Sequence, residues 1–282
     1  MPRVERDGTG LYYETDGEGE TVAFVGDLGY GAWQWGWQHA ALAGPYETLT
    51  WDLRGTGRSD VPEGPYSVDD LAADLEAVLS AASPRGAHLV GTGLGGMVAL
   101  RYALDSDRAR SLALLGTAAG GPHRPENPLG LYAPPDDPEA LRETLRPVLT
   151  EEFFVEQPSV VDGIVRWRAG TRPEVAEAAE SPAELAAARD GGDATGDGWR
   201  AQAAAVEAFD CRDRLHEITE PALVIHGTAD AVWPPGGGEA LAEGLPRGRH
   251  EPVAGGPHLV GVEYSRIVND LLSGFLADRT RE

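Results

Sequence analysis

Short apolar runs alternate with helical patterns through the first half of the chain. Strands are predicted where apolar and β-branched residues cluster: Leu11–Tyr13, Thr21–Val25, Glu47–Trp51, Ala87–Val90 and Ser111–Leu115. Ser67 is predicted to cap a helix, because apolar residues recur at helical spacing after it. A second helix is predicted after Gly95. Strands that alternate with helices indicate crossover units and a mainly parallel sheet.

The pattern changes near Gly120, and up to about Glu217 it contains no convincing strand. Acidic helices are expected around Glu139–Leu149, Val160–Trp167, Ala183–Ala188 and Trp199–Phe209. Strands resume at Ala222–His226 and, more weakly, at Arg249–Val253, and a final helix is predicted over Leu259–Leu276. We therefore predict an α/β core over residues 1–120 and 218–282, with a helical cap inserted at residues 121–217. The cap is expected over the C-terminal edge of the sheet, where ligands bind in such folds.

Charge and composition exclude several classes of protein. All 23 basic residues are arginine, against 46 acidic residues, and the formal net charge is −23. Without lysine there is no Schiff-base chemistry and no phosphate-loop lysine. The acidity argues against nucleic acid and anionic membranes as partners. One cysteine, Cys211, excludes an internal disulfide and a Cys-built metal site, and it is expected to be a small buried residue.

The chain is expected to be a soluble, cytoplasmic protein. Its first residues have no apolar signal-peptide core, and no run approaches the ~18–20 apolar residues of a membrane span. The negatively charged residues repel one another at low ionic strength. At ~1 M salt the screening length falls to ~3 Å, and this repulsion largely disappears. We therefore expect a halophilic protein with an acidic surface. The alternative is an ordinary acidic protein from a GC-rich genome.

Three motifs follow predicted strands. The segment Asp52–Ser59 (DLRGTGRS) contains glycines that permit a tight loop, which its charged residues are expected to fix through hydrogen bonds. The segment Leu89–Met97 (LVGTGLGGM) joins a strand to a helix and has Gly93 at the turn. Asp230 and His258 follow two successive strands, and their spacing suits a strand–helix–strand crossover. Both side chains are therefore expected at the same edge of the sheet.

Together these motifs resemble the α/β-hydrolase family over essentially the whole chain. The resemblance implies an α/β-hydrolase fold, with a mostly parallel central sheet, helices on both faces and a helical cap. It also implies that His258 moves protons and that Asp230 orients it. The family's nucleophile elbow has the pattern Gly-x-Ser-x-Gly. Gly91 and Gly95 match that pattern, but Gly93 occupies the serine position, so acyl transfer through a serine is not expected.

The loop after Val25 also departs from the family pattern, since Gly26–Gly29 replaces the usual His-Gly. The resemblance assigns the oxyanion-hole N–H groups to Leu28 and Leu94. A carboxylate at Asp27 would oppose negative charge there unless it faces away or is protonated. These two departures favour repurposing of the site. Relief of backbone strain by glycine, or an engineered inactivation of a serine esterase, are the alternatives for position 93.

Other candidate sites give weaker indications. Trp33, Trp35 and Trp233 are predicted to line, with Asp27, a pocket for a small and largely apolar ligand, although such residues more often pack in a core. Gly91–Gly96 also matches a dinucleotide-binding pattern, but no acidic residue closes the next strand, so this is a remote alternative. The histidines lack metal-ligand spacing, and neither a metal nor a cofactor is expected.

We interpret the chain as an atypical, serine-independent enzyme. The missing serine hydroxyl is expected to leave room for a water beside His258. His258, oriented by Asp230, would activate that water to hydrolyse a small ester or lactone, or would abstract a substrate proton. The alternative class is a non-catalytic pseudo-hydrolase that binds a small ligand or a partner. The substrate and the oligomeric state stay open.

Overall fold

An eight-stranded sheet forms the centre of the computed structural model, which describes residues 2–82, 85–170 and 191–279. The strands lie in the order β1-β2-β4-β3-β5-β6-β7-β8. Their bounds are β1 (Arg3–Arg6), β2 (Thr9–Asp16), β3 (Thr21–Val25), β4 (Glu47–Trp51), β5 (Ala87–Thr92), β6 (Ala109–Leu115), β7 (Ala222–Gly227) and β8 (Gly248–Val253). The β1–β2 and β2–β4 pairs are antiparallel, and every later pair is parallel. The predicted mostly parallel sheet is therefore confirmed.

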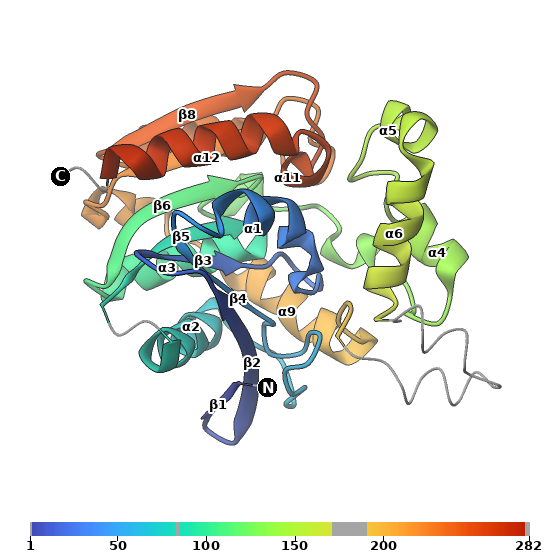
Figure 1. Ribbon diagram of the computed structural model, residues 1–282, viewed down its shortest axis with the longest axis horizontal. Coiled ribbons are helices and arrows are strands. Elements are labelled where there is room, and N and C mark those ends of the chain that lie inside the picture. The colour runs from blue at the N-terminus through green and yellow to red at the C-terminus, as the bar shows by residue number, and fades with distance from the viewer. Residues whose placement is uncertain (1, 83–84, 171–190, 280–282) are drawn as a thin grey trace.

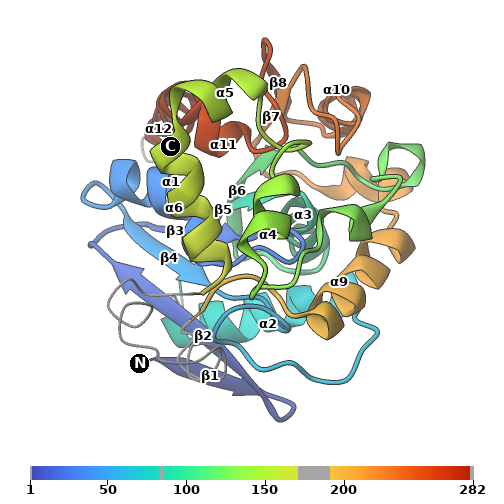
Figure 2. The ribbon, with the colours of Figure 1, turned by 90° about the vertical axis from the view of Figure 1, so that its right-hand side faces the viewer.

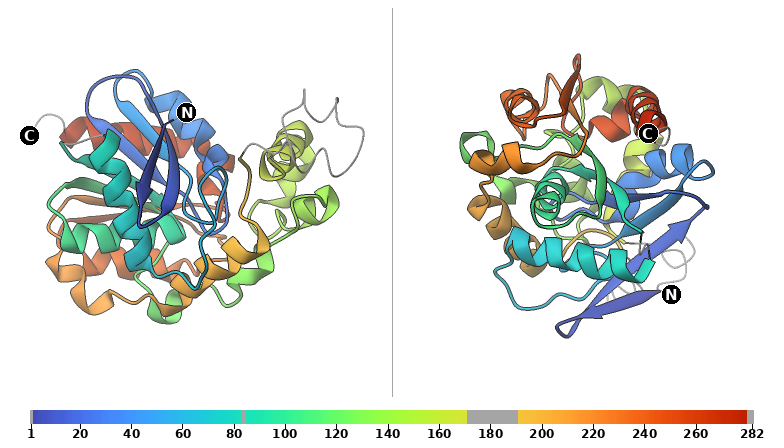
Figure 3. Two further views of the ribbon diagram at one scale, coloured as in Figure 1. Left: turned by 90° about the horizontal axis from the view of Figure 1, so that it is seen from below. Right: turned by 90° about the vertical axis from the view of Figure 1, so that its left-hand side faces the viewer.

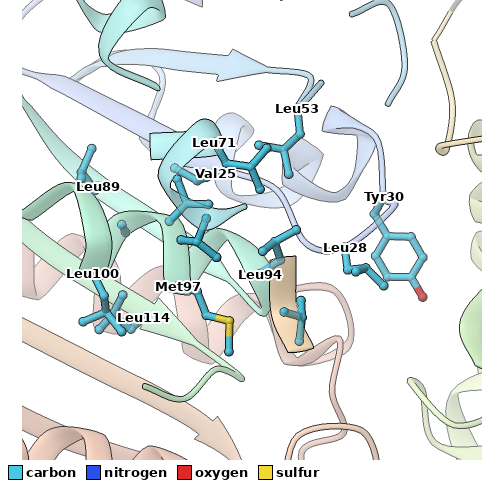
Figure 4. Packing of buried hydrophobic residues seen from close by; sticks show 14 of the residues in the cluster. Val25, Leu28, Tyr30, Leu53, Leu71, Leu89, Leu94, Met97, Leu100 and Leu114 are labelled. Atoms are coloured by element: carbon cyan, nitrogen blue, oxygen red, sulfur yellow. The ribbon is translucent and has the colours of Figure 1, made fainter. Parts of the chain in front are cut away.

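Helices cover both faces of this sheet (Figures 1 and 3). One face carries α1 (Gly36–Leu42), α11 (Val260–Glu263) and α12 (Ser265–Arg279), and the other carries α2 (Val68–Ala82), α3 (Leu94–Asp105) and α10 (Gly236–Gly244). Every residue of β3 and β5 is buried, as expected for strands covered on both sides. Figure 4 shows Leu71 of α2 and Met97 and Leu100 of α3 packed against the sheet.

Between β6 and β7 the described residues form helices and turns but no named strand. The helices of this inserted segment are η2 (Gly121–His123), η3 (Pro128–Leu131), α4 (Pro138–Glu143), α5 (Glu151–Glu156), α6 (Pro158–Arg168), α9 (Gly196–Ala208) and η4 (Arg212–Glu217). Figures 1 and 2 show α4, α5 and α6 beyond the ends to which β6 and β8 point. The helix predicted around Ala183–Ala188 lies outside the described residues.

Several local predictions were wrong. Strand β1 was missed, because Arg3–Arg6 is a charged edge segment without an apolar run. The final helix is broken rather than continuous: α11 ends before Tyr264, whose backbone leaves the helical region, and α12 starts at the next residue. The short helices η1 (Ala32–Trp35), α1 and α10 were also missed, because glycine and tryptophan interrupt their helical pattern.

The Asp52–Ser59 loop has the structural role that its sequence predicts. Asp52 accepts hydrogen bonds from the backbone N–H groups of Ala32, at 3.1 Å, and Arg58, at 2.9 Å. The Arg54 guanidinium forms a two-pronged, buried contact with Asp74 of α2, at 2.5 and 2.6 Å. These contacts fix the loop beside the carboxyl ends of the parallel strands, close to the segment that carries Asp27.

Candidate functional site

The turn between β5 and α3 is built for a residue without a side chain. Gly93 has φ +50° and ψ −116°, a backbone conformation that residues with a side chain rarely adopt. Its N–H donates to the Leu115 carbonyl at 3.1 Å, and its own carbonyl accepts from the Thr117 hydroxyl at 2.6 Å. The elbow geometry is therefore present, and the helix N-terminus that follows it begins at Leu94.

Asp230 and His258 meet at the same edge of the sheet, after β7 and β8. The Asp230 Oδ2 lies 3.1 Å from Nδ1 of His258. Its Oδ1 accepts from the backbone N–H groups of Val232 and Trp233, each at 2.8 Å. His226 Nε2 is also 3.4 Å from Asp230 Oδ2, a neighbour that the sequence analysis did not identify. The spatial pairing expected from the family resemblance is thus present.

The Asp27 carboxylate occupies the centre of the site. Its Oδ1 accepts hydrogen bonds from the N–H groups of Leu28, at 2.7 Å, and Leu94, at 2.8 Å. Its Oδ2 lies 2.7 Å from Nε2 of His258. A Cβ added at Gly93 would overlap this carboxylate. The space that was expected to hold a water at position 93 is therefore filled by Asp27, which faces the predicted oxyanion hole instead of turning away.

Asp230, His258 and Asp27 form a buried row of side chains with alternating charge. Burial by itself would lower the pKa of His258, but the carboxylates of Asp230 and Asp27 outweigh it and raise the pKa to about 10. Burial opposes ionisation of Asp230, yet the two neighbouring histidines bring its pKa below the usual range. At neutral pH an imidazolium thus lies between two carboxylates. His258 has no lone pair free to take a proton in this state.

The loop that carries Asp27 is fixed from both sides. The Asp27 N–H donates to Oε1 of Gln34, at 3.2 Å. Two residues later, the Gly29 N–H donates to Oε1 of Gln202 in α9, at 2.7 Å, and its carbonyl accepts from the N–H of Ala194, at 2.7 Å. Gly29 has φ +74°, which suits glycine. Residues of the inserted segment therefore hold the turn that directs Asp27 inward.

The predicted pocket residues do not surround one cavity. Trp33 and Trp35 line a cleft of about 870 Å³, but neither Asp27 nor Trp233 is among its lining residues. Trp35 also stacks on Phe24, with ring centroids 5.0 Å apart, in the core beside α1. The side chain of Trp233 is buried, and the backbone N–H of this residue donates to Oδ1 of Asp230. Trp35 thus packs in the core, and Trp233 positions Asp230.

A small cavity of about 20 Å³ borders His258. It has room for about one water molecule. Two buried polar atoms of its lining residues, Oε1 of Gln38 and Nε1 of Trp35, have no hydrogen-bond partner within the described part of the chain. An acceptor and a donor of this kind suit a polar occupant. The cavity is lined by Gln34, Trp35, Gln38, Thr92, Leu115, His258, Leu259, Gly261 and Val262.

The described residues offer neither a metal-binding cluster nor a reactive thiol. Over residues 2–82, 85–170 and 191–279, no group of three or more His, Cys, Asp or Glu residues is arranged to hold a metal ion. Burial raises the pKa of the Cys211 thiol to about 12, so this buried residue is a poor nucleophile. None of the helices in the same residues is both long and apolar enough to cross a membrane.

Comparisons with known proteins agree with this architecture. A protein of Azorhizobium caulinodans named carbamate hydrolase RutD is 30% identical over 285 residues, covering 99% of both chains. The crystal structure of the enol-lactonase from Burkholderia xenovorans has a TM-score of 0.79 at 24% identity, covering 98% of this chain and all of that one. Est816, described as an N-acyl homoserine lactone degrading enzyme, has a TM-score of 0.71 at 27% identity, covering 97% of this chain and all of its own. The family described as alpha/beta hydrolase fold matches residues 28–263, and the chain belongs to this family.

Proposed function

We propose that this chain is a hydrolase of small, largely apolar substrates that works without a serine nucleophile. The observation that supports this function is the junction at Gly93. A carboxylate, an imidazole and two backbone N–H groups meet there within hydrogen-bond distance. Relatives named for hydrolysis of carbamates and enol-lactones indicate small substrates. The helices α4, α5 and α6, within residues 121–217, would act as the cap over that junction.

His258 would act first as an acid and then as a base. With its Nε2 proton in place, it donates to a leaving group, and the neutral imidazole that results accepts a proton from water. Asp230 keeps the ring in one orientation and stabilises its charged form. Such acid–base catalysis contributes about 10²–10⁴-fold to a rate. The cavity beside His258 is the proposed place for the water.

A non-catalytic binding protein is the second candidate. It is favoured by one specific observation: Asp27 already satisfies both N–H groups of the predicted oxyanion hole. In that case the charged side chains of Asp27, His258 and Asp230 would only stabilise the fold, and no substrate would turn over.

A substrate panel separates the two candidates. Purified wild type, His258→Gln and the matched control His216→Gln, an exposed histidine, are assayed on small esters, lactones, carbamates and epoxides. We expect His258→Gln to lose at least about 10³-fold of the wild-type turnover, with His216→Gln unchanged. Equal unfolding temperatures would show that both variants are folded. Turnover that survives in His258→Gln, or a wild type inert on every class, would refute the proposed function.

A further inference from the structure

We propose that Asp27 is the nucleophile of this enzyme and that its substrate is a strained cyclic ether, opened to a vicinal diol. The nucleophile would thus come from the loop after β3 instead of from the elbow after β5. This inference rests on the proposed function, because it needs His258 to run a hydrolytic cycle. Carboxylates serve as nucleophiles in other enzymes, where they form covalent esters.

The positions of the two carboxylate oxygens favour an attack on an alkyl carbon. An acyl substrate must place its own carbonyl oxygen between the oxyanion-hole N–H groups. Here Oδ1 of Asp27 occupies that position, 2.7 Å from the N–H of Leu28 and 2.8 Å from that of Leu94. Displacement at a saturated carbon needs no such hole. The site as built therefore selects against acyl transfer and leaves Oδ2 as the attacking atom.

The first step opens the ring. A lone pair on Oδ2 of Asp27 forms a bond to a ring carbon, and the bond from that carbon to the ring oxygen breaks. The electron pair goes to the ring oxygen, which takes the Nε2 proton of His258, the group 2.7 Å from Oδ2. The products are a hydroxyalkyl ester of Asp27 and a neutral imidazole. A halide leaving group would not remove that proton, so it would leave His258 unable to act as a base.

The second step hydrolyses the ester. Neutral His258 takes a proton from water, and the water oxygen attacks Cγ of Asp27. The negative charge that develops on Oδ1 already faces the two N–H groups, so no group has to move to stabilise it. The bond from Cγ to the alkyl-bearing oxygen breaks, and the departing diol oxygen takes the proton from His258. The new carboxylic acid returns its proton to His258, which restores the resting charges.

Gly93 is the positioning residue in this scheme. A side chain at the elbow would overlap the carboxylate of Asp27. The φ of +50° lets glycine make the turn at low cost and leave the space to Asp27. The missing elbow side chain and the carboxylate in the preceding loop are therefore one arrangement, in which the position of Asp27 requires glycine at position 93.

A single-turnover experiment in water labelled with oxygen-18 tests the proposal, with wild-type enzyme in excess over styrene oxide. We expect diol without the heavy label in the first turnover, and heavy oxygen in the peptide that contains Asp27. Labelled diol with an unlabelled Asp27 would overturn the covalent step and leave the proposed hydrolase intact. Epoxide left unchanged while an ester or lactone is hydrolysed would overturn the substrate class. Absence of His258-dependent turnover on every substrate class would instead refute the proposed function.

Variants at position 27 provide a second measurement. Asp27→Asn keeps the shape of the side chain but removes the nucleophile, and we expect it to lose at least about 10³-fold of the epoxide turnover. The matched control is Asp213→Asn, an exposed carboxylate, for which no change is expected. Circular dichroism and unfolding temperature report whether each variant is folded. Retention of epoxide turnover by folded Asp27→Asn would overturn the proposal.

Discussion

Two buried clusters of charged side chains in this molecule differ in whether a proton can be transferred from them. In the inserted segment, Arg168 contacts Asp193 at 2.6 Å, and both side chains are almost fully buried. The Arg168 guanidinium also donates to the Leu141 carbonyl and the Thr144 hydroxyl, each at 2.8 Å. Burial opposes its charge, but Asp193 raises the pKa of Arg168 above the already high ordinary value. One cation therefore meets one anion, and the pair stays ionised.

At the centre of the fold, two carboxylates share one imidazole. Asp27 and Asp230 contact opposite nitrogens of His258, so one negative charge is left over and is compensated by backbone N–H groups. Unlike a guanidinium, an imidazole can lose its proton within the range of solution pH. Burial and pairing alone therefore do not identify a structural ion pair. The first group can only hold the fold together, whereas the second can also transfer a proton.

The largest effect should come from removing the Asp27 side chain and placing a serine at position 93. Gly93→Ser alone is expected to be inert on esters, because its side chain would overlap Asp27. In Asp27→Gly/Gly93→Ser the hole is free and His258 faces a serine, so we expect a burst of p-nitrophenol from p-nitrophenyl acetate. The initial rate should exceed that of Gly93→Ser by at least about 10³-fold. An inert, folded double variant would show that a serine at position 93 and free oxyanion-hole N–H groups are not sufficient for ester cleavage in this fold.

Removing one partner should destabilise the structural pair far more than the centre. Asp193→Ala leaves the Arg168 charge buried and unpaired, so the free energy of unfolding should fall by about 3–5 kcal/mol. Asp27→Asn should cost less than about 1 kcal/mol, because Asp230 still pairs with His258. Urea unfolding measures both changes. Equal losses would mean that the two buried groups contribute alike to stability.

The pH dependence of stability provides the third test. The pKa of His258 is about 10 in the folded chain, against 6.5 for an ordinary histidine. Its stabilising contribution is therefore complete below about pH 6.5 and is lost as the pH rises towards 10. We expect wild type to lose of the order of 3 kcal/mol more than His258→Gln between pH 6 and pH 10. Parallel pH profiles for the two proteins would contradict the charged imidazole.

A smaller effect is expected from filling the cavity beside His258. A methyl group at Gly261 would meet Oε1 of Gln38 and Cδ2 of Leu115 at 3.6 Å, an ordinary contact. Gly261→Ala should therefore fold normally but slow hydrolysis about tenfold, because the methyl displaces the proposed water. The matched control is Gly274→Ala, in an exposed part of α12 with nothing nearby. Equal rates for the two variants would place the hydrolytic water elsewhere.

The smallest effect concerns the surface instead of the buried groups. With a net charge of −23, repulsion among exposed carboxylates should destabilise the chain at low ionic strength. We expect the unfolding temperature to rise by a few degrees between low and ~1 M salt, since the screening length falls to ~3 Å. A buried group such as Arg168–Asp193 is screened much less, so Asp193→Ala should show the same salt response. A flat profile would contradict the halophilic interpretation.

The fold could be predicted from local sequence patterns, whereas the position of Asp27 in the site could not. The apolar run Val22–Val25 made strand Thr21–Val25 predictable to the residue, because a strand buried on both faces has little room for polar residues. The pairing of Asp230 with His258 was predictable, since both follow parallel strands that end at one edge. The direction of the Asp27 side chain was not, because it depends on Gln202 and Ala194, about 170 residues away in the sequence. No local pattern reports such a contact.

The cavity beside His258 was also beyond prediction. Gln34 and Gln38 are four residues apart in a segment rich in tryptophan, and this spacing is equally compatible with a solvated helix face. Gln38 is buried because it packs against Gly261 from the other end of the chain, whose carbonyl accepts from the Gln38 amide. The predicted tryptophan pocket failed for a similar reason, because tertiary packing placed Trp35 on Phe24.

The overlap between position 93 and the Asp27 carboxylate restricts the routes by which mutation can reach this centre. A side chain at position 93 and the present position of the Asp27 carboxylate exclude each other, so a variant with serine at position 93 beside Asp27 would have to turn the carboxylate away. A path of single substitutions between a serine at position 93 and a carboxylate at position 27 that avoids this overlap passes through a protein with glycine at position 93 and no carboxylate at position 27. With Asp27 in its present position, a serine introduced at position 93 alone meets the same overlap. In a laboratory lineage that introduces an elbow serine, the removal of the Asp27 carboxylate would therefore come before the change at position 93.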